Sequence, residues 1–183
     1  MKSKQKIKGG EKMKRNQVQR MMDWIKLTCS VPRFYSYKPL LIKLLKENSP
    51  KTILEWGCGQ STKLMKQFCP TAEIHSIEHD WRWYIRQKIS INSKIHLIPL
   101  NKGYATPDFP ENYFDFIFVD AKKKVIPDCT RTALKLVKDD GLILLHDARK
   151  VKGKINYSKS SLGYTLLLRK NDEPRFSDEE LDY

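Results

Sequence analysis

The fold is decided by the stretch Thr52-Ile53-Leu54-Glu55-Trp56-Gly57-Cys58-Gly59-Gln60-Ser61-Thr62. Its first three residues are apolar or β-branched, which predicts a buried strand. Gly57 and Gly59 then allow the backbone to turn sharply and to approach a ligand closely. Ser61 or Thr62 can cap the helix that follows. A strand, a glycine turn and a helix in this order predict a nucleotide site at the carboxyl end of a parallel sheet.

The same stretch argues against two common nucleotide sites. A dinucleotide fingerprint needs a third glycine at position 62, where the chain has Thr62, and the Gly-Lys-Ser/Thr of a phosphate-binding loop is missing too. Glu55 at the strand end would repel a pyrophosphate but suits a cationic ligand. A sulfonium nucleoside with an amino group fits this pattern. A tight turn that binds no ligand is the alternative at this point.

A second acidic residue ends the next expected strand, residues 73–78. The segment Glu73-Ile74-His75-Ser76-Ile77-Glu78 alternates in part like a half-buried strand. Glu78 lies 21 residues after Gly57, close to the spacing at which an acidic residue reaches ribose hydroxyls in such units. The two strand ends together strengthen the prediction of a nucleoside site.

Four segments, in this order, resemble the motifs of class I S-adenosylmethionine-dependent methyltransferases over about residues 50 to 170. They are Glu55 to Thr62, Ser76 to Asp80, Phe114 to Ala121 and Leu144 to Arg149. The resemblance implies methyl transfer from S-adenosyl-L-methionine. Glu55, Gly57 and Gly59 would hold its methionine end and Glu78 its ribose. The full set expected to bind the cofactor is Glu55, Gly57, Cys58, Gly59, Ser61, Glu78, His79 and Asp120.

Strands that alternate with helices along the chain favour an α/β fold with a doubly wound, mostly parallel sheet. This is the Rossmann-like methyltransferase fold that the resemblance also implies. An N-terminal helical layer is expected from helices over residues 17–27 and 39–47. The aromatic stretch between these helices, which ends at Tyr37, either packs them together or walls a substrate pocket. Further strands are expected over 95–100, 114–119, 142–145 and 163–169, with a turn at Asp139-Asp140-Gly141.

Two carboxylates follow neighbouring strands and should point into one cleft. Asp120 and Asp147 could there share a divalent cation that acidifies a hydroxyl. Similar metal-dependent catechol-type O-methyltransferases have an Asp at each of these strand ends, an Asn after the second, and a Lys three residues after the first as general base. Lys123 matches this pattern. Ala148 stands where the Asn is expected, so a third metal ligand is missing and no residue is assigned to a metal.

Catalysis without a metal is the alternative, with Asp120, His146 or Asp147 as the base. His146 has the one side chain whose unperturbed pKa lies near neutral pH. A histidine that simply faces the sheet or the solvent is the competing interpretation. The candidate catalytic residues are therefore Asp120, Lys123, His146 and Asp147.

The length of 183 residues favours a single domain. We expect a disordered basic arm over residues 1–16, one methyltransferase-like domain over 17–170 and an acidic tail over 171–183. No apolar run approaches 18 residues, and the basic N-terminus lacks the apolar core of a secretory signal. The four cysteines, at positions 29, 58, 69 and 129, are scattered without a C-x-x-C pair, which indicates a reducing, cytoplasmic compartment.

The formal net charge is +14, and residues 1–20 contain eight Lys or Arg against Glu11 alone. Such an arm can hold nucleic acid through phosphate contacts, or it can be a solvated tail. Methylation of base amines is disfavoured, because Asp120-Ala121-Lys122-Lys123 is not the Asn/Asp-Pro-Pro-Tyr/Phe motif of those enzymes. Our first hypothesis is a methyltransferase acting on a hydroxyl of a small-molecule or glycan acceptor. The alternatives are an RNA methyltransferase guided by the arm, and a catalytically silent module that binds nucleic acid or a partner.

Overall fold

The computed structural model describes residues 37–90, 93–148, 151–152, 158–160, 163–171 and 173–176. All of them belong to one unit, Ser36–Tyr183. The expected basic arm, the expected helix over 17–27 and residues 177–183 of the expected acidic tail lie outside the described residues. Among the described helices, none combines the length and the hydropathy that crossing a membrane would require.

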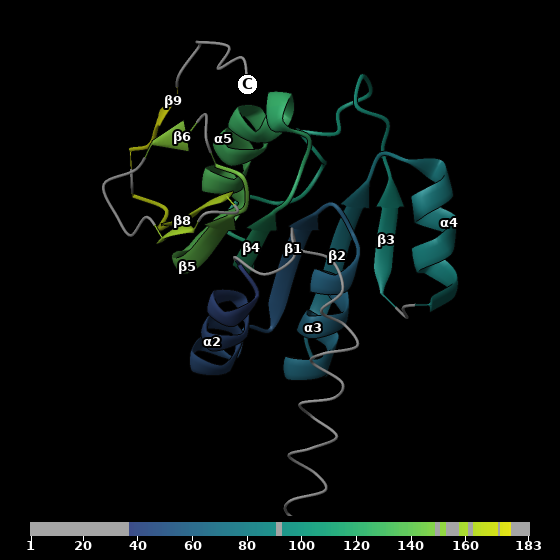
Figure 1. The fold of residues 1–183 in the computed structure, drawn as a ribbon, viewed down its shortest axis with the longest axis horizontal. Helices are drawn as coiled ribbons and strands as arrows, with labels where there is room; N and C mark the ends of the chain where they lie inside the picture. Colours follow the sequence, from purple (N-terminus) through teal and green to yellow (C-terminus); the bar gives the residue numbers. More distant parts are fainter. Residues whose placement is uncertain are drawn as a thin grey trace, which may run out of the picture. The chain divides into compact units, whose positions relative to one another are not determined.

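The apolar runs form a mostly parallel sheet with the strand order β3-β2-β1-β4-β5-β8-β7 (Figure 1). Five strands are parallel to their neighbours: β1 (Thr52–Trp56), β2 (Glu73–Glu78), β3 (Lys94–Leu97), β4 (Phe114–Val119) and β5 (Val137–Leu145). β8 (Gly163–Leu168) runs antiparallel to β5, and β7 (Ser158–Ser160) runs antiparallel to β8. β6 (Val151–Lys152) and β9 (Arg175–Phe176) pair separately. The predicted doubly wound α/β fold is confirmed.

The helices connect the strands and pack on the sheet. They are α2 (Lys38–Asn48), α3 (Gln60–Phe68), α4 (Trp81–Ser90), the short 3-10 helix η2 (Lys123–Val125) and α5 (Ile126–Leu136). α3 contacts β2 and α2, α4 contacts β2 and β3, and α5 contacts β4 and β5. α2 begins with Pro39 in its first turn, where a missing backbone N–H costs no hydrogen bond.

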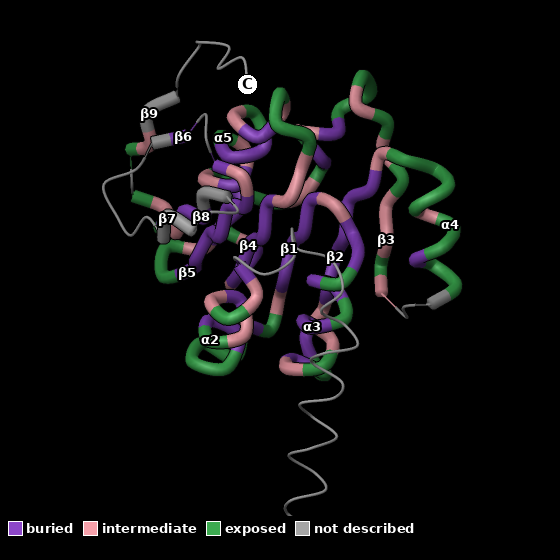
Figure 2. The backbone as a smooth tube through the Cα atoms, viewed as in Figure 1, coloured by how far each residue is buried: buried purple, intermediate pink, exposed green. Residues whose placement is uncertain are grey.

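Alternation along the strands separates two faces of the sheet. Leu54, Trp56 and Val119 belong to the main apolar core, which includes the buried side of α5. The intervening positions point to the other face, where Phe118 contacts Tyr37 at the start of α2 and Glu55 contacts α3. The buried strands show as a purple centre in Figure 2. Polar residues at intervening positions near the carboxyl ends of the strands therefore share one face.

Three expectations from the sequence need correction. Asp139-Asp140-Gly141 is part of β5 and not a turn between elements. Phe114 of β4 pairs with Val137 and Phe116 pairs with Leu142, so β5 has more residues than β4 between these two pairs and forms a bulge there. Gly141 is required there, because a Cβ would lie 2.6 Å from Val137. The third strand is shorter than expected and ends at Leu97. The expected acidic tail contains the short strand β9.

Candidate active site at the carboxyl ends of the strands

The glycine turn after β1 is built around Gly57. Its φ is +85°, a left-handed conformation that side chains disfavour. Its N–H donates to the carbonyl of Ile77 at 2.8 Å, and a Cβ at this position would lie 2.2 Å from the carbonyl oxygen of Asp120. Gly57 therefore lets the turn close against the ends of both β2 and β4.

Gly59 and Cys58 connect this turn to two helices. The N–H of Gly59 donates to Oγ1 of Thr62 at 2.8 Å, at the start of α3. Nε1–H of Trp83, in the first turn of α4, donates to the carbonyl of Cys58 at 2.5 Å. A Cβ on Gly59 would meet only the Trp83 ring, at 3.8 Å. Gly59 thus leaves open space on the turn, as close approach of a ligand requires.

Glu55 is fully buried beneath the start of α3. Ser61 donates its hydroxyl hydrogen to Oε1, while Thr62 and Ser76 donate to Oε2 at 2.5 and 2.9 Å. Burial raises the pKa of Glu55 to about 7, an effect that the three hydroxyl groups partly offset and the charge of Asp120 reinforces. No lysine or arginine among the described residues forms an ion pair with this carboxylate. Ser76, which the sequence analysis did not select, is thus part of the cluster.

Glu78 ends β2 with only 4% of its surface exposed. Its Oε1 accepts the backbone N–H groups of His79 and Asp80 at 2.8 and 2.9 Å. Oε2 has a single weak neighbour, the thiol of Cys58 at 3.5 Å. One oxygen of Glu78 is therefore fixed by the backbone, and the other faces the glycine turn with capacity to accept hydrogen bonds from hydroxyl groups.

Asp120 and His146 come together at the ends of β4 and β5. Oδ1 of Asp120 lies 3.0 Å from Nδ1 of His146, so Nδ1–H donates and the lone pair is placed on Nε2. Nε2 is buried and has no partner among the described residues. Burial by itself lowers the pKa of His146, but the hydrogen bond and charge of Asp120, with the charge of Asp147, raise it above its usual value. This pair has the geometry of a general base with its orienting carboxylate.

Tyr37 is a further residue of the site, at the start of α2. Its ring contacts His146 edge-on, with 4.6 Å between the centroids, and Phe118 at 5.0 Å. It is buried, and burial together with the charges of Asp120 and Glu55 raises the pKa of its hydroxyl well above the usual range. The sequence analysis left open whether this aromatic stretch packs or lines a pocket. Tyr37 packs, and it does so against the histidine of the site.

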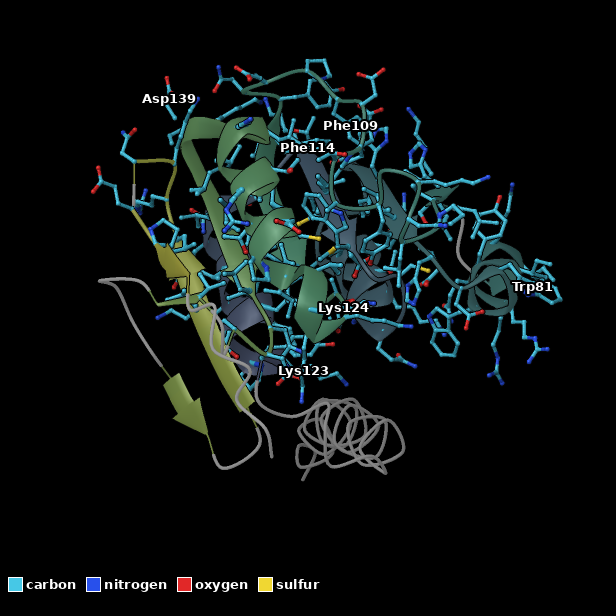
Figure 3. The ribbon with its side chains drawn as sticks, turned by 90° about the horizontal axis from the view of Figure 1, so that it is seen from above. Trp81, Phe109, Phe114, Lys123, Lys124 and Asp139 are labelled. Atoms are coloured by element: carbon cyan, nitrogen blue, oxygen red, sulfur yellow. The ribbon has the colours of Figure 1, made fainter. Side chains whose placement is uncertain are left out.

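The remaining catalytic candidates form no hydrogen bond with Asp120 or His146 within the part of the chain that the structure describes. Lys123 is exposed on η2 (Figure 3), and within the described residues no ion pair or hydrogen bond links it to Asp120 or His146. Asp147 is partly exposed and has a φ of 55°. Its neighbour Ala148 is buried and supplies no ligand atom. The described residues contain no group of three or more His, Cys, Asp or Glu arranged to hold a metal ion, so no step through a metal is derived.

Comparisons with known proteins indicate the family of the chain. A family model described as O-methyltransferase matches residues 11–173. Among solved structures, the O-methyltransferase TomG of Streptomyces achromogenes, in complex with SAM, is 20% identical, with 89% of this chain and 91% of that chain covered and a TM-score of 0.57. An O-methyltransferase of Bacillus cereus in complex with SAH is 17% identical, with 83% and 89% covered and a TM-score of 0.57. A putative O-methyltransferase of Klebsiella pneumoniae is 20% identical, with 71% and 78% covered and a TM-score of 0.53. A comparison with curated protein sequences found no significant match.

The strand order and the likeness to TomG show the Rossmann-like fold of class I S-adenosylmethionine-dependent methyltransferases. The chain belongs to the O-methyltransferase family and is an S-adenosylmethionine-dependent enzyme. The residues present fit this cofactor, because the buried carboxylates of Glu55 and Glu78 suit a cationic nucleoside. Among the described residues, Oε2 of Glu78 has only the thiol of Cys58 as a partner.

Proposed function

We propose that this enzyme methylates a hydroxyl group of a small-molecule or glycan acceptor, with His146 as general base and Asp120 as the group that orients it. The observation that carries the proposal is the 3.0 Å contact between Nδ1 of His146 and Asp120 while the buried Nε2 has no described partner. A base must present a lone pair within hydrogen-bond reach of the proton that it removes. Nε2 carries this lone pair, since Nδ1–H is already used in the hydrogen bond to Asp120.

In this proposal the other residues of the site hold the cofactor. Glu55, with Ser61 and Cys58, serves the methionine end of the cofactor, and Glu78, with His79, serves the ribose. The cofactor, when bound, supplies an electrophilic methyl group. Nε2 of His146 accepts the proton of the acceptor hydroxyl, and the carboxylate of Asp120 stabilises the imidazolium that forms. Loss of this proton makes the acceptor oxygen a better nucleophile toward the methyl group that the cofactor would supply; the S–CH3 bond would break and S-adenosylhomocysteine would leave with the electron pair.

The chemistry of the acceptor is supported by the segment after Asp120. Lys122, Lys123 and Lys124 are all exposed there, and such a run suits an anionic acceptor such as a sugar acid. We propose that Lys123 binds the acceptor or assists proton removal. An RNA acceptor guided by residues 1–20 has no support from the described residues, because that arm lies outside them.

We place the enzyme in the cytoplasm, since the three described cysteines are unpaired.

The proposal is tested by assaying the enzyme with labelled S-adenosylmethionine on a panel of catechols, phenols and uronic acids. We expect an O-methyl product with at least one of them. His146→Ala should lower kcat by about 10²–10⁴ while S-adenosylhomocysteine still binds. His96→Ala, a histidine on β3 that contacts His75 and Phe109 and not the site, is the matched control and should keep normal turnover. An N-methyl product, or full turnover by His146→Ala, would refute the proposal.

A further inference from the structure

Helix α4 exposes an unusual amount of apolar surface. Of the five large hydrophobic side chains that are exposed in the described residues, four lie on this helix: Trp81, Trp83, Ile85 and Ile89. The fifth, Leu97, lies on β3, against which α4 packs. In Figure 2 the tube of α4 is largely green, in contrast to the purple strands at the centre of the sheet. Isolated apolar side chains on a surface are normal, but this many on one ten-residue helix indicates an interaction surface.

The apolar side chains of α4 form a stripe that faces outward. Trp81, Ile85 and Ile89 follow one another at intervals of four residues, so they lie on one face of the helix. They are 56%, 46% and 83% exposed, and Figure 3 shows Trp81 pointing away from the sheet. On the opposite side the buried residue is polar, Gln87. α4 therefore exposes apolar side chains on a face where a surface helix usually presents polar ones.

Cations border this stripe on both sides. With 100° per residue, Arg82 and Arg86 follow the stripe on one flank and Lys88 lies on the other, and all three are exposed. The guanidinium of Arg82 lies 5.6 Å from the ring centroid of Trp81. The helix contains no acidic residue. We call the six residues Trp81, Arg82, Ile85, Arg86, Lys88 and Ile89 the α4 surface.

We propose that the α4 surface docks onto an anionic lipid membrane, with the stripe inserted at the level of the headgroups and the three cations against lipid phosphates. This combination of an apolar face with tryptophan and flanking Lys or Arg is what binds a helix in the plane of a membrane interface. The net charge of +14 adds long-range attraction to an anionic surface. A nucleic acid would instead place its phosphates against the exposed apolar side chains of Ile85 and Ile89. A lipid surface also needs no shape complementarity.

Docking through α4 would also orient the active site. Trp83, on the same helix, donates to the carbonyl of Cys58 in the glycine turn, so the start of α4 and the cofactor turn are mechanically joined. When the protein is bound to a membrane through α4, the carboxyl ends of the strands would therefore stay at a fixed distance from the bilayer surface. The docking itself requires no turnover, and its test is independent of the proposed function.

The first experiment is cosedimentation of the full chain with vesicles of phosphatidylcholine alone and with 30% phosphatidylserine, where that fraction is roughly a cytoplasmic-leaflet mimic. We expect binding to the anionic vesicles that weakens with salt. Ile85→Ser with Ile89→Ser should reduce the partition coefficient by at least about tenfold, with an unchanged melting temperature and unchanged S-adenosylhomocysteine binding. Quenching of tryptophan fluorescence by brominated lipid should fall in Trp81→Phe. Equal binding by the isoleucine variant and the parent would overturn the proposal.

A second experiment separates the α4 surface from general electrostatics. Arg82→Gln with Arg86→Gln should weaken vesicle binding more than Lys43→Gln with Lys63→Gln, which removes the same charge from exposed positions on α2 and α3. Equal losses, or a loss seen only when the lysines of residues 1–16 are replaced, would show binding by net charge or by the arm and would overturn the proposal. Absence of vesicle binding would also overturn the proposal. This holds even if the isoleucine variant loses self-association or RNA binding, because the α4 surface would then bind another copy of the chain or RNA and not a membrane.

Discussion

Glu55 and Glu73 are the same kind of side chain at opposite ends of adjacent strands, and their surroundings differ completely. Glu55, at the carboxyl end of β1, is buried among hydroxyl groups, and burial raises its pKa to about 7. Glu73 begins β2 at the amino end, where hydrogen bonds from Lys94, His75 and Tyr113 lower its pKa to about 2. Glu55 has no cationic side chain as a partner among the described residues and is available to a cationic ligand, whereas Glu73 already has its partners.

The contrast extends to the neighbouring carboxylates. At the amino end, Asp115 accepts the backbone N–H groups of Lys51 and Thr52 at 2.8 Å and forms an ion pair with Lys138 at 2.6 Å. At the carboxyl end, Glu78 and Asp120 have only backbone N–H groups, a thiol and imidazoles as described partners. Charge at the amino end stabilises the sheet. Charge at the carboxyl end remains available for a cationic cofactor and for proton transfer.

The largest predicted effect is at the turn that shapes the carboxyl end. Gly57→Ala places a Cβ 2.2 Å from the Asp120 carbonyl at a φ of +85°, so the free energy of unfolding should fall by at least about 3 kcal/mol. Gly59→Ala, whose Cβ would meet only ordinary contacts at 3.8 Å, should lose less than about 1 kcal/mol and yet bind S-adenosylhomocysteine more weakly. Urea denaturation and calorimetry measure the two quantities. Equal stability of both variants would contradict this account of the turn.

The next effect compares the acidic residues at the two ends of β2. Glu78→Ala removes the oxygen that faces the cofactor turn and should weaken S-adenosylhomocysteine binding by about 1–3 kcal/mol. Glu73→Gln, at the other end of the same strand, should leave binding unchanged and alter only stability. Calorimetric titration of both variants makes the measurement. Weaker binding by Glu73→Gln would show that the two ends are not functionally separate.

Much of this arrangement is predictable from the sequence, because it depends on local patterns. The strand over 73–78 and the helix after Gly59 follow from alternation and turn residues, and the carboxyl ends of parallel strands must meet at one edge of the sheet. Glu55, Glu78, Asp120 and His146 could therefore be selected as candidates before any geometry was known. The order of the four motifs indicated the methyltransferase family.

Other features depend on packing across distant segments and have no local signal. Asp139-Asp140-Gly141 has the composition of a turn, yet pairing with β4 holds it in β5 as a bulge. The contact of Tyr37 with His146 joins residues more than a hundred positions apart. The conformation at the end of β5 determines whether His146 faces Asp120, Asp147 or solvent, and the sequence His146-Asp147 does not. A third hydroxyl on Glu55, from Ser76, is likewise visible only once β1 and β2 are paired.

A smaller effect tests the proton-transfer role of the carboxyl end. Turnover needs neutral His146, whose pKa Asp120 raises above 6.5, so kcat of the parent enzyme should rise with pH through a midpoint above 6.5. Asp120→Asn keeps an acceptor for Nδ1–H but removes the charge. Burial then dominates and lowers the pKa, so the midpoint should move below 6.5 while the maximal rate falls. A pH–rate profile of both proteins decides this, and a midpoint that does not move would exclude His146 as the titrating base.

The smallest predicted signal is a proton released when the cofactor site is filled. At pH 6 free Glu55, with a pKa of about 7, is mostly protonated, and the cationic amino group of S-adenosylhomocysteine should favour the ionised form. Binding should therefore release up to about one proton at pH 6 and almost none above pH 8. Calorimetry in two buffers with different ionisation enthalpies measures the release. Glu55→Gln should abolish it, while Glu73→Gln should not, because Glu73 is already ionised at pH 6. Proton release that persists in Glu55→Gln would show that another group loses the proton. It would contradict the proposed difference between Glu55 and Glu73.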